Sequence, residues 1–159
     1  PVVNRAVSVH SAALLEARAA LQLGHLAAAR TVRSWLADRI GDCAELDLMR
    51  AWTAETEGHE PQTRALLRPL LESAQAALMP HTPVEAWLLE AGLCHSAGDR
   101  AAARQALSTA LGLAKPIDAV RPFAMAPPGV RTLLAAQQGS FGASNTFAAR
   151  ALGAATARQ

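Results

Sequence analysis

The residues of this sequence best suited to covalent catalysis are Cys94 and His95, since an imidazole that takes the proton of a thiol produces a strong nucleophile. Neighbouring residues of a helix point about 100° apart, so this pair cannot form the hydrogen bond that such activation requires. We interpret Cys94 as a packing residue instead. The sequence predicts no catalytic residue and no enzyme.

The remaining chemistry-bearing residues also lack the spacing of known sites. The five histidines show no ligand spacing with cysteines or carboxylates, and His59-Glu60 lacks the second histidine of a zinc-binding helix. The segment "SFGASN" (140–145) has neither the lysine nor the preceding strand of a phosphate-binding loop. We therefore predict no metal site and no cofactor.

The composition indicates the elements that must position any site. Alanine makes up about a quarter of the 159 residues, tyrosine is absent, and aromatic residues are 4%. Alanine favours helices that pack closely, whereas strands favour β-branched and aromatic residues. The sequence therefore predicts an all-α fold.

Charge, cysteine content and hydropathy limit the possible partners and the compartment. The net charge is +2 and basic residues alternate with acidic ones, so the dense basic face of a nucleic-acid-binding surface is missing. Two cysteines provide no disulfide framework, which indicates a reducing, cytoplasmic setting. No apolar run approaches the length of a membrane span, so we expect no membrane contact. The chain opens with Pro1 and not with Met, and we expect it to be part of a longer protein.

Three segments align on a central glycine: "LEARAALQLGHLAAAR" (15–30), "MRAWTAETEGHEPQTR" (49–64) and "LEAGLCHSAGDRAAAR" (89–104). Gly24 and Gly58 are 34 residues apart, and the 40 residues from Gly58 to Gly98 include the breaker-rich Met79–Pro83. A 34-residue period of helix–turn–helix units is typical of tetratricopeptide repeats. The large aromatic positions of that consensus are mostly unfilled, and an ordinary helical bundle is the alternative.

Small residues recur at fixed distances from these glycines, seven and four residues before and five residues after. We predict that they let the two helices of each hairpin approach closely. They are Ala17, Ala20 and Ala29 in the first segment, Ala51, Ala54 and Thr63 in the second, and Ala91, Cys94 and Ala103 in the third.

Start and stop signals predict where the helices lie. Thr82–Glu85 provides a capping threonine, a proline at the first helical position and a glutamate at the third, and Asp42–Glu45 provides a similar cap. Asn145 is suited to cap the last helix. The predicted helices lie near 5–23, 26–40, 43–57, 61–79, 83–97, 100–114 and 128–138, with the last one starting at Asn145. We predict three tetratricopeptide-like hairpins in a right-handed superhelix over 1–116, followed by a capping segment with terminal helices over 117–159.

In such an array the first helix of each hairpin lines a concave groove that binds a peptide or a small polar ligand. Counting from the aligned glycines predicts the residues of this groove. They are Arg18, Gln22, Glu45, Trp52, Glu55, Glu85 and His95. Trp52 is the predicted anchor. The alternative interpretation is that Trp52 fills a packing gap between hairpins, or that this face forms a dimer contact.

Paired arginines recur on each second helix at a spacing that places both on one face: Arg30 with Arg33, Arg64 with Arg68, and Arg100 with Arg104. A solvated outer surface is the first interpretation of these pairs. A stripe that contacts phosphates or an acidic partner is the second.

The chain from about Val84 to Leu152 carries a more particular pattern. The alanine- and leucine-rich run Ala106–Ala114 is followed by "VRPF" (Val120–Phe123), an apolar "VRTLLAA" (Val130–Ala136) and "FAARAL" (Phe147–Leu152). This order resembles the end of the helical-repeat region of large, ATP-binding LuxR-type transcriptional regulators of the MalT kind. The chain departs from that family in having Asp118-Ala119 before the valine and alanine and methionine after the phenylalanine.

The resemblance implies a bacterial regulator whose array is followed by a helix-turn-helix DNA-binding domain and is often preceded by a nucleotide-binding or cyclase-like module. Neither module lies within the 159 residues, so DNA would be reached only through a domain outside this chain. The expected partners are a protein or small-molecule effector, or a second copy of the chain in a homo-oligomer. The alternative is a stand-alone tetratricopeptide adaptor or chaperone-like protein that binds a peptide.

The "VRPF" segment has a predicted structural role as well. Pro122 is expected to prevent helix continuation and to hold Arg121 in extended backbone. The chain would then turn back and place Phe123 against the end of the array, where it covers the last hydrophobic face.

Overall fold

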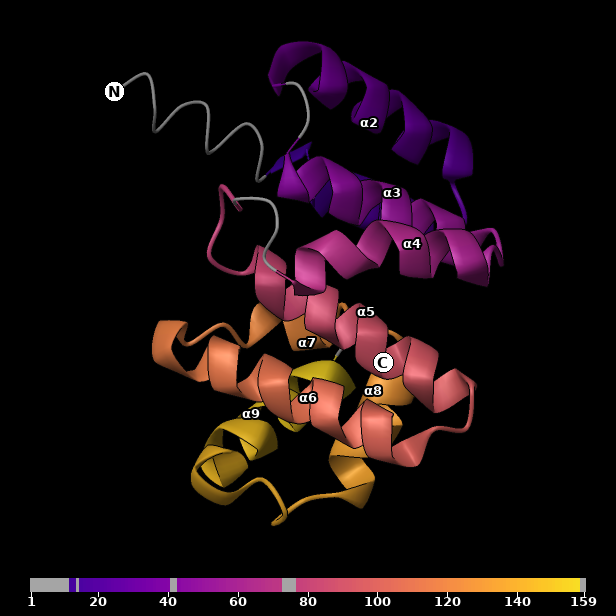
Figure 1. Ribbon diagram of the computed structural model, residues 1–159. Coiled ribbons are helices and arrows are strands. Elements are labelled where there is room, and N and C mark those ends of the chain that lie inside the picture. The colour runs from indigo at the N-terminus through magenta and orange to yellow at the C-terminus, as the bar shows by residue number, and fades with distance from the viewer. Residues whose placement is uncertain (1–11, 14, 41–42, 73–76, 158–159) are drawn as a thin grey trace. The chain divides into compact units, whose positions relative to one another are not determined.

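The computed structural model describes residues 12–13, 15–40, 43–72 and 77–157 (Figure 1). These residues form helices and turns, with no strand among them, so the predicted all-α fold is confirmed. The chain divides into two compact units, residues 1–82 and 83–159. The third predicted hairpin therefore belongs to the same unit as the C-terminal segment, whereas the sequence predicted a boundary at 116.

Unit 1 contains a helix over residues 15–22, then α2 (Leu26–Ile40), α3 (Ala44–Thr56) and α4 (Glu60–Leu71). α3 packs against both α2 and α4. α3 is the most deeply buried element, because large apolar side chains on several of its faces are covered. Its fully buried side chains include Leu46, Leu48, Met49 and Trp52.

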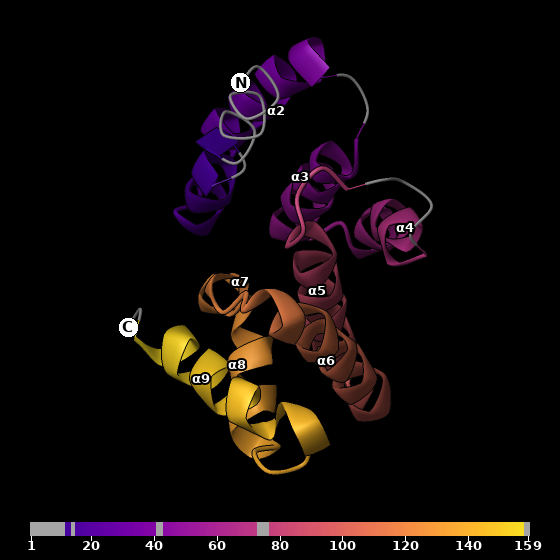
Figure 2. The same cartoon turned by 90° about the vertical axis from the view of Figure 1, so that its left-hand side faces the viewer.

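Unit 2 is built from four longer helices with short helical turns between them. α5 (Thr82–Ser96), whose first residue belongs to unit 1, and α6 (Arg100–Ala114) form a hairpin. α7 (Arg121–Ala124) and α8 (Pro128–Ala136) both contact α9 (Asn145–Thr156) (Figure 2). A continuous core joins α5, α6, α7, α8 and α9. The remaining described elements are the 3-10 turns η1 (Lys115–Ile117) and η2 (Gly142–Ser144).

The three aligned glycines form three copies of one turn. Gly24, Gly58 and Gly98 have φ angles of 76°, 78° and 80°. In each turn the glycine N–H donates to the carbonyl three residues earlier, and the next N–H donates to the carbonyl five residues earlier, at 2.7 to 3.1 Å. This is the Schellman helix ending, whose left-handed residue is usually glycine because other residues are strained there. The predicted hairpin turns are confirmed.

The small residues around these turns are buried, as predicted. All nine are at most 8% exposed, and most of them are at 3% or less. Their short side chains allow the paired helix backbones to pack closely, which is the condition that the aligned pattern predicted. They are Ala17, Ala20, Ala29, Ala51, Ala54, Thr63, Ala91, Cys94 and Ala103.

The segment after α6 differs from the prediction. Arg121 is not extended but begins the short helix α7, with Pro122 in its first turn. Proline is tolerated there because the first N–H groups of a helix have no partner within the helix. The left-handed backbone of this segment lies at Asp118, which has a φ of 51°. Phe123 is 1% exposed and meets Phe147 edge to face with ring centres 5.9 Å apart, so its predicted burial is confirmed.

Several predicted helix ends also differ. α4 ends at Leu71 and not near 79. Cys43 precedes α3 without a side-chain cap, and the hydroxyl of Thr82 donates to Glu45. Asn145 accepts a hydrogen bond from the backbone N–H of Phe141 at 2.7 Å and so stabilises the preceding loop. Asp42 and the first part of the predicted helix 5–23 lie outside the described residues.

Candidate ligand-binding pocket

Unit 1 contains a cavity of about 390 Å³ between α2, α3 and α4. Cavities of this size hold small organic ligands. Its polar lining consists of Arg33, Ser34, Arg50, Thr53, Glu57 and Gln62, and its apolar lining of Ala37, Ala54 and Leu66. Ala54 belongs to the set of small hairpin residues, so the packing pattern also shapes the floor of this cavity.

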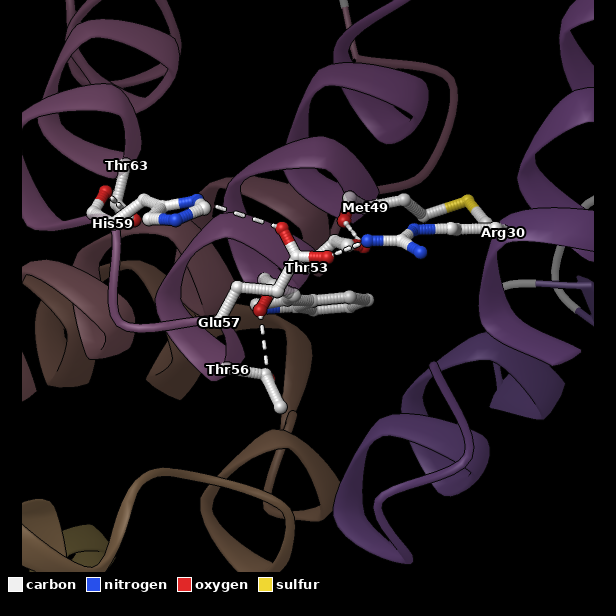
Figure 3. A network of polar contacts seen from close by, with 8 residues as sticks. Arg30, Met49, Thr53, Thr56, Glu57, His59 and Thr63 are labelled. Atoms are coloured by element: carbon white, nitrogen blue, oxygen red, sulfur yellow. Dashed lines mark hydrogen bonds and ion pairs between the residues drawn. The ribbon is translucent and has the colours of Figure 1, made fainter. Parts of the chain in front are cut away.

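Glu57, the residue that follows α3, organises one edge of the pocket. The guanidinium Nη2 of Arg30 donates to Glu57 Oε1, and His59 Nδ1 lies 3.6 Å from Oε2 (Figure 3). The carboxylate lies between a guanidinium from α2 and an imidazole from the α3–α4 turn. The Schellman turn at Gly58 fixes this arrangement because it sets the direction of the chain between Glu57 and His59.

Two arginines line the pocket, and they differ in whether a described carboxylate pairs with them. Arg50 Nη1 donates to Asp47 Oδ1 at 3.0 Å, one helical turn away on α3. Arg33 on α2 is partly buried, and no hydrogen-bond acceptor or carboxylate among the described residues pairs with it. Burial lowers the pKa of Arg33 below its ordinary value, and the positive charges of Arg50 and Arg30 lower it further.

The charges around the pocket do not balance. The described residues that line the pocket carry two guanidinium groups, those of Arg33 and Arg50, and one carboxylate, that of Glu57. Among these lining residues one positive charge is in excess, and Arg33 is the guanidinium for which no described residue provides a partner. Guanidinium groups bind carboxylates and phosphates through paired N–H donors, so this arrangement is suited to an anionic group.

Three of the predicted groove residues are buried and do not line an open surface. Arg18 is 8% exposed, Trp52 2% and Glu45 0%. Arg18 Cζ lies 4.7 Å from the centre of the Trp52 ring. Trp52 therefore fills space in the interior of unit 1, which agrees with the packing interpretation and not with an exposed anchor.

Glu45 is buried because it binds a loop. Its Oε1 accepts hydrogen bonds from the backbone N–H groups of Leu78 (2.7 Å) and Met79 (2.9 Å) and from the hydroxyl of Thr82 (2.9 Å). Its Oε2 is buried and has no hydrogen-bond partner among the described residues. The predicted groove residue is thus a structural acceptor that ties the loop after α4 to the start of α3.

The other four predicted groove residues are divided between the two units. Gln22 is exposed and Glu55 is partly buried in unit 1, and Glu85 and His95 are partly buried in unit 2. The His95 ring packs against Gly129, where an added Cβ would lie 2.7 Å from its Cδ2. Of the seven predicted residues, the structure brings Arg18 and Trp52 into contact.

The pocket residues were not predicted as a site. The spacing of Arg30 and Arg33 has two interpretations, a solvated outer surface and a stripe that contacts phosphates or an acidic partner; in the structure Arg30 is exposed and Arg33 is partly buried. The three arginine pairs are not equivalent: Arg64 donates to Glu60 at 2.9 Å, and Arg104 donates to the carbonyl of Ser140 at 3.4 Å. No sequence signal indicated that Arg50 and Gln62 line the same cavity as Arg33.

Within the described part of the chain, no helix is both long and apolar enough to span a membrane. The same residues hold no cluster of three or more histidine, cysteine or acidic side chains that is suited to bind a metal ion. Comparisons with protein-family models, with curated proteins and with solved structures gave no match.

Proposed function

We propose that this chain is the signal-sensing and protein-interaction region of a LuxR-type transcriptional regulator. In this proposal an effector, a partner protein or a second copy of the chain binds the helical hairpins. Binding then biases a DNA-binding domain outside this chain through the difference in affinity between two conformations. The protein would act in the cytoplasm and would have no enzymatic activity of its own.

The observation that carries the proposal is the threefold repetition of one turn between helices. The same turn occurs at Gly24, Gly58 and Gly98, with small residues buried at the same distances from it. In repeat proteins, hairpins of this kind serve mainly as binding scaffolds. The resemblance of residues 84–152 to the end of the repeat region of LuxR-type regulators supports the more specific assignment.

A second candidate is a stand-alone tetratricopeptide adaptor or chaperone-like protein that binds a peptide. The pocket of unit 1, which Arg33 and Arg50 line, supports this second candidate, because arginines can bind the carboxylate of a peptide. The two candidates differ in what is attached to the hairpins, because only the regulator needs a DNA-binding domain.

The coding sequence downstream of Gln159 distinguishes the two candidates. A helix-turn-helix domain there supports the regulator, and a stop codon supports the adaptor. For the regulator, DNA binding by the parent protein should change when the hairpin region binds its partner or self-associates. DNA binding that stays the same when the hairpin region is deleted would overturn the relay role.

A further inference from the structure

We propose that the pocket between α2, α3 and α4 binds a carboxylate group, with Arg33 as its main contact and Arg50 as the second. This inference rests on the proposed function in taking unit 1 as a binding module, and it adds the chemical class of the ligand. The pocket, its arginines and the apolar residues beside them all belong to unit 1.

Arg33 provides the first argument. Its guanidinium carries five N–H donors and lines the pocket, and none of the described acceptors is bonded to it. The other two arginines already have carboxylate partners, Arg30 in Glu57 and Arg50 in Asp47. A partly buried guanidinium beside two like charges is stabilised by an anion that accepts two of its hydrogen bonds at once.

The charge count selects the kind of anion. The described lining residues Arg33, Arg50 and Glu57 carry one excess positive charge, so a monoanion neutralises it. A phosphate monoester carries nearly two negative charges at neutral pH and would leave the site negative. It would also place oxygens near the Glu57 carboxylate, which lines the same cavity. A carboxylate carries a single negative charge on two oxygens, so it avoids the first cost and lowers the second.

The rest of the lining indicates what the carboxylate is attached to. Ser34 and Gln62 provide neutral hydrogen-bonding groups, and Ala37, Ala54 and Leu66 provide a small apolar surface. A volume of about 390 Å³ accommodates a small organic acid or the last residue or two of a peptide. Both sources present the same group to Arg33, and the experiment separates them.

The experiment follows the Arg Nε–Hε signals of the full chain by NMR during titration at constant ionic strength and pH 7. The probes are sodium acetate, sodium benzoate, inorganic phosphate and sodium chloride. N-acetyl-trialanine is added with either a free C-terminal carboxylate or a C-terminal amide. We expect the Arg33 signal to shift and saturate with the carboxylates and not with chloride.

Arg33→Gln and the matched control Arg39→Gln each remove one positive charge from α2. Arg39 stacks over Trp35, with Cζ 4.4 Å from the ring centre, and is not part of the pocket lining. We expect Arg33→Gln to weaken benzoate binding at least tenfold, Arg39→Gln to leave it within twofold, and Arg33→Lys to restore it in part. Unchanged far-UV circular dichroism of all three variants shows that folding is not the cause.

The outcomes are separable. Tighter binding of the tripeptide acid than of benzoate, with no binding of the amide, identifies a peptide end; tighter binding of benzoate identifies a free acid. Phosphate binding more tightly than every carboxylate, equal losses in both glutamine variants, or shifts that never saturate overturn the proposal. If the chain binds no carboxylate but the parent's DNA binding still depends on the hairpins, the carboxylate site fails and the proposed function survives.

Discussion

The guanidinium of Arg18 lies over the ring of Trp52, with Cζ 4.7 Å from the ring centre, and both side chains are buried. Each residue stands six positions before the glycine of its hairpin, so the two occupy equivalent places in successive repeats. The third equivalent place is Gly92, where an added Cβ would lie 3.0 Å from the Pro127 ring. This repeat position is therefore covered by a neighbouring element and is not part of an open groove.

The contact between Arg18 and Trp52 should contribute to the stability of unit 1. A desolvated cation–π pair contributes up to about 2 kcal/mol, so Arg18→Met, which keeps most of the length but removes the charge, should lower the free energy of unfolding by about 1–2 kcal/mol. Urea denaturation followed by far-UV circular dichroism measures the change. Arg39→Met is the control, because Arg39 is exposed and stacks on the partly exposed Trp35. Equal stability of Arg18→Met and the parent chain would show that packing alone holds Trp52.

Glu45 should be the most sensitive acidic residue of unit 1. Glu45→Ala removes the acceptor of three hydrogen bonds, from the backbone N–H groups of Leu78 and Met79 and from the hydroxyl of Thr82, and the last two residues are buried. We expect a loss of about 2–4 kcal/mol in the free energy of unfolding, since each unsatisfied buried group costs about 1–3 kcal/mol. Glu45→Gln keeps one acceptor oxygen and should lose about 1 kcal/mol on the same scale.

The control for Glu45 is Glu60→Gln, which alters an exposed pair with Arg64 one helical turn away. Exposed pairs contribute about 0–1 kcal/mol, so this variant should unfold close to the parent chain. Similar losses for Glu45→Gln and Glu60→Gln would show that the three hydrogen bonds of Glu45 have no special weight.

The sequence predicted what is local and missed what depends on distant partners. The turns at Gly24, Gly58 and Gly98 and the burial of the small residues follow from spacing within one hairpin, and the sequence predicted both. Glu45 bonds a loop more than 30 residues away, and Arg33 meets Arg50 from another helix. The spacing of polar and apolar residues along the sequence cannot identify such pairs. A polar residue that faces solvent and a polar residue that bonds a buried N–H look the same in that spacing.

The prediction for Arg121 failed because tertiary packing outweighs a local backbone preference. The rule that a residue before proline avoids the helical region is a preference, and here the first turn of α7 overrides it. Phe123 is buried against Phe147, and α7 contacts α9, so tertiary packing supports the helical backbone. A backbone preference of one residue is weaker than the burial of an aromatic ring.

The thiol of Cys43 should titrate above the ordinary range. The residue is 7% exposed, and burial raises its pKa above the ordinary value of 9.0; the neighbouring charge of Glu45 acts in the same direction. The folded chain therefore keeps the proton at pH values where the unfolded chain has released it. Between 9.0 and the folded pKa, stability should fall as pH rises.

Alkylation by iodoacetamide across pH 7–11 measures this shift, with a Cys94→Ala background to isolate Cys43. Alanine fits at position 94 because Ala20 and Ala54 occupy the equivalent places in the other hairpins. We expect the midpoint of the rate profile to lie above that of the same chain in urea. A folded midpoint at or below the urea value would contradict the burial of the thiol.

A side chain at a hairpin glycine should destabilise the chain, although there is room for one. A Cβ added at Gly98 meets nothing within 4 Å, so the only cost of Gly98→Ala is its backbone, which has a φ of 80°. That strain is about 1–2 kcal/mol for a residue other than glycine. Gly112 in α6 also has open space, but it has helical backbone, where alanine is better than glycine by about 1 kcal/mol. Both positions lie in unit 2, so the pair separates backbone conformation from packing.

Gly98→Ala should therefore lower the free energy of unfolding by about 1–2 kcal/mol and Gly112→Ala should raise it by about 0.5–1 kcal/mol, measured by urea denaturation. Gly98→Asn should fall between Gly98→Ala and the parent chain, since asparagine tolerates left-handed backbone better than alanine does. If Gly98→Ala were as stable as Gly112→Ala, Gly98 would not have left-handed backbone in solution. The shared Schellman turn, which is the strongest structural support for a repeated hairpin, would then lose its third copy.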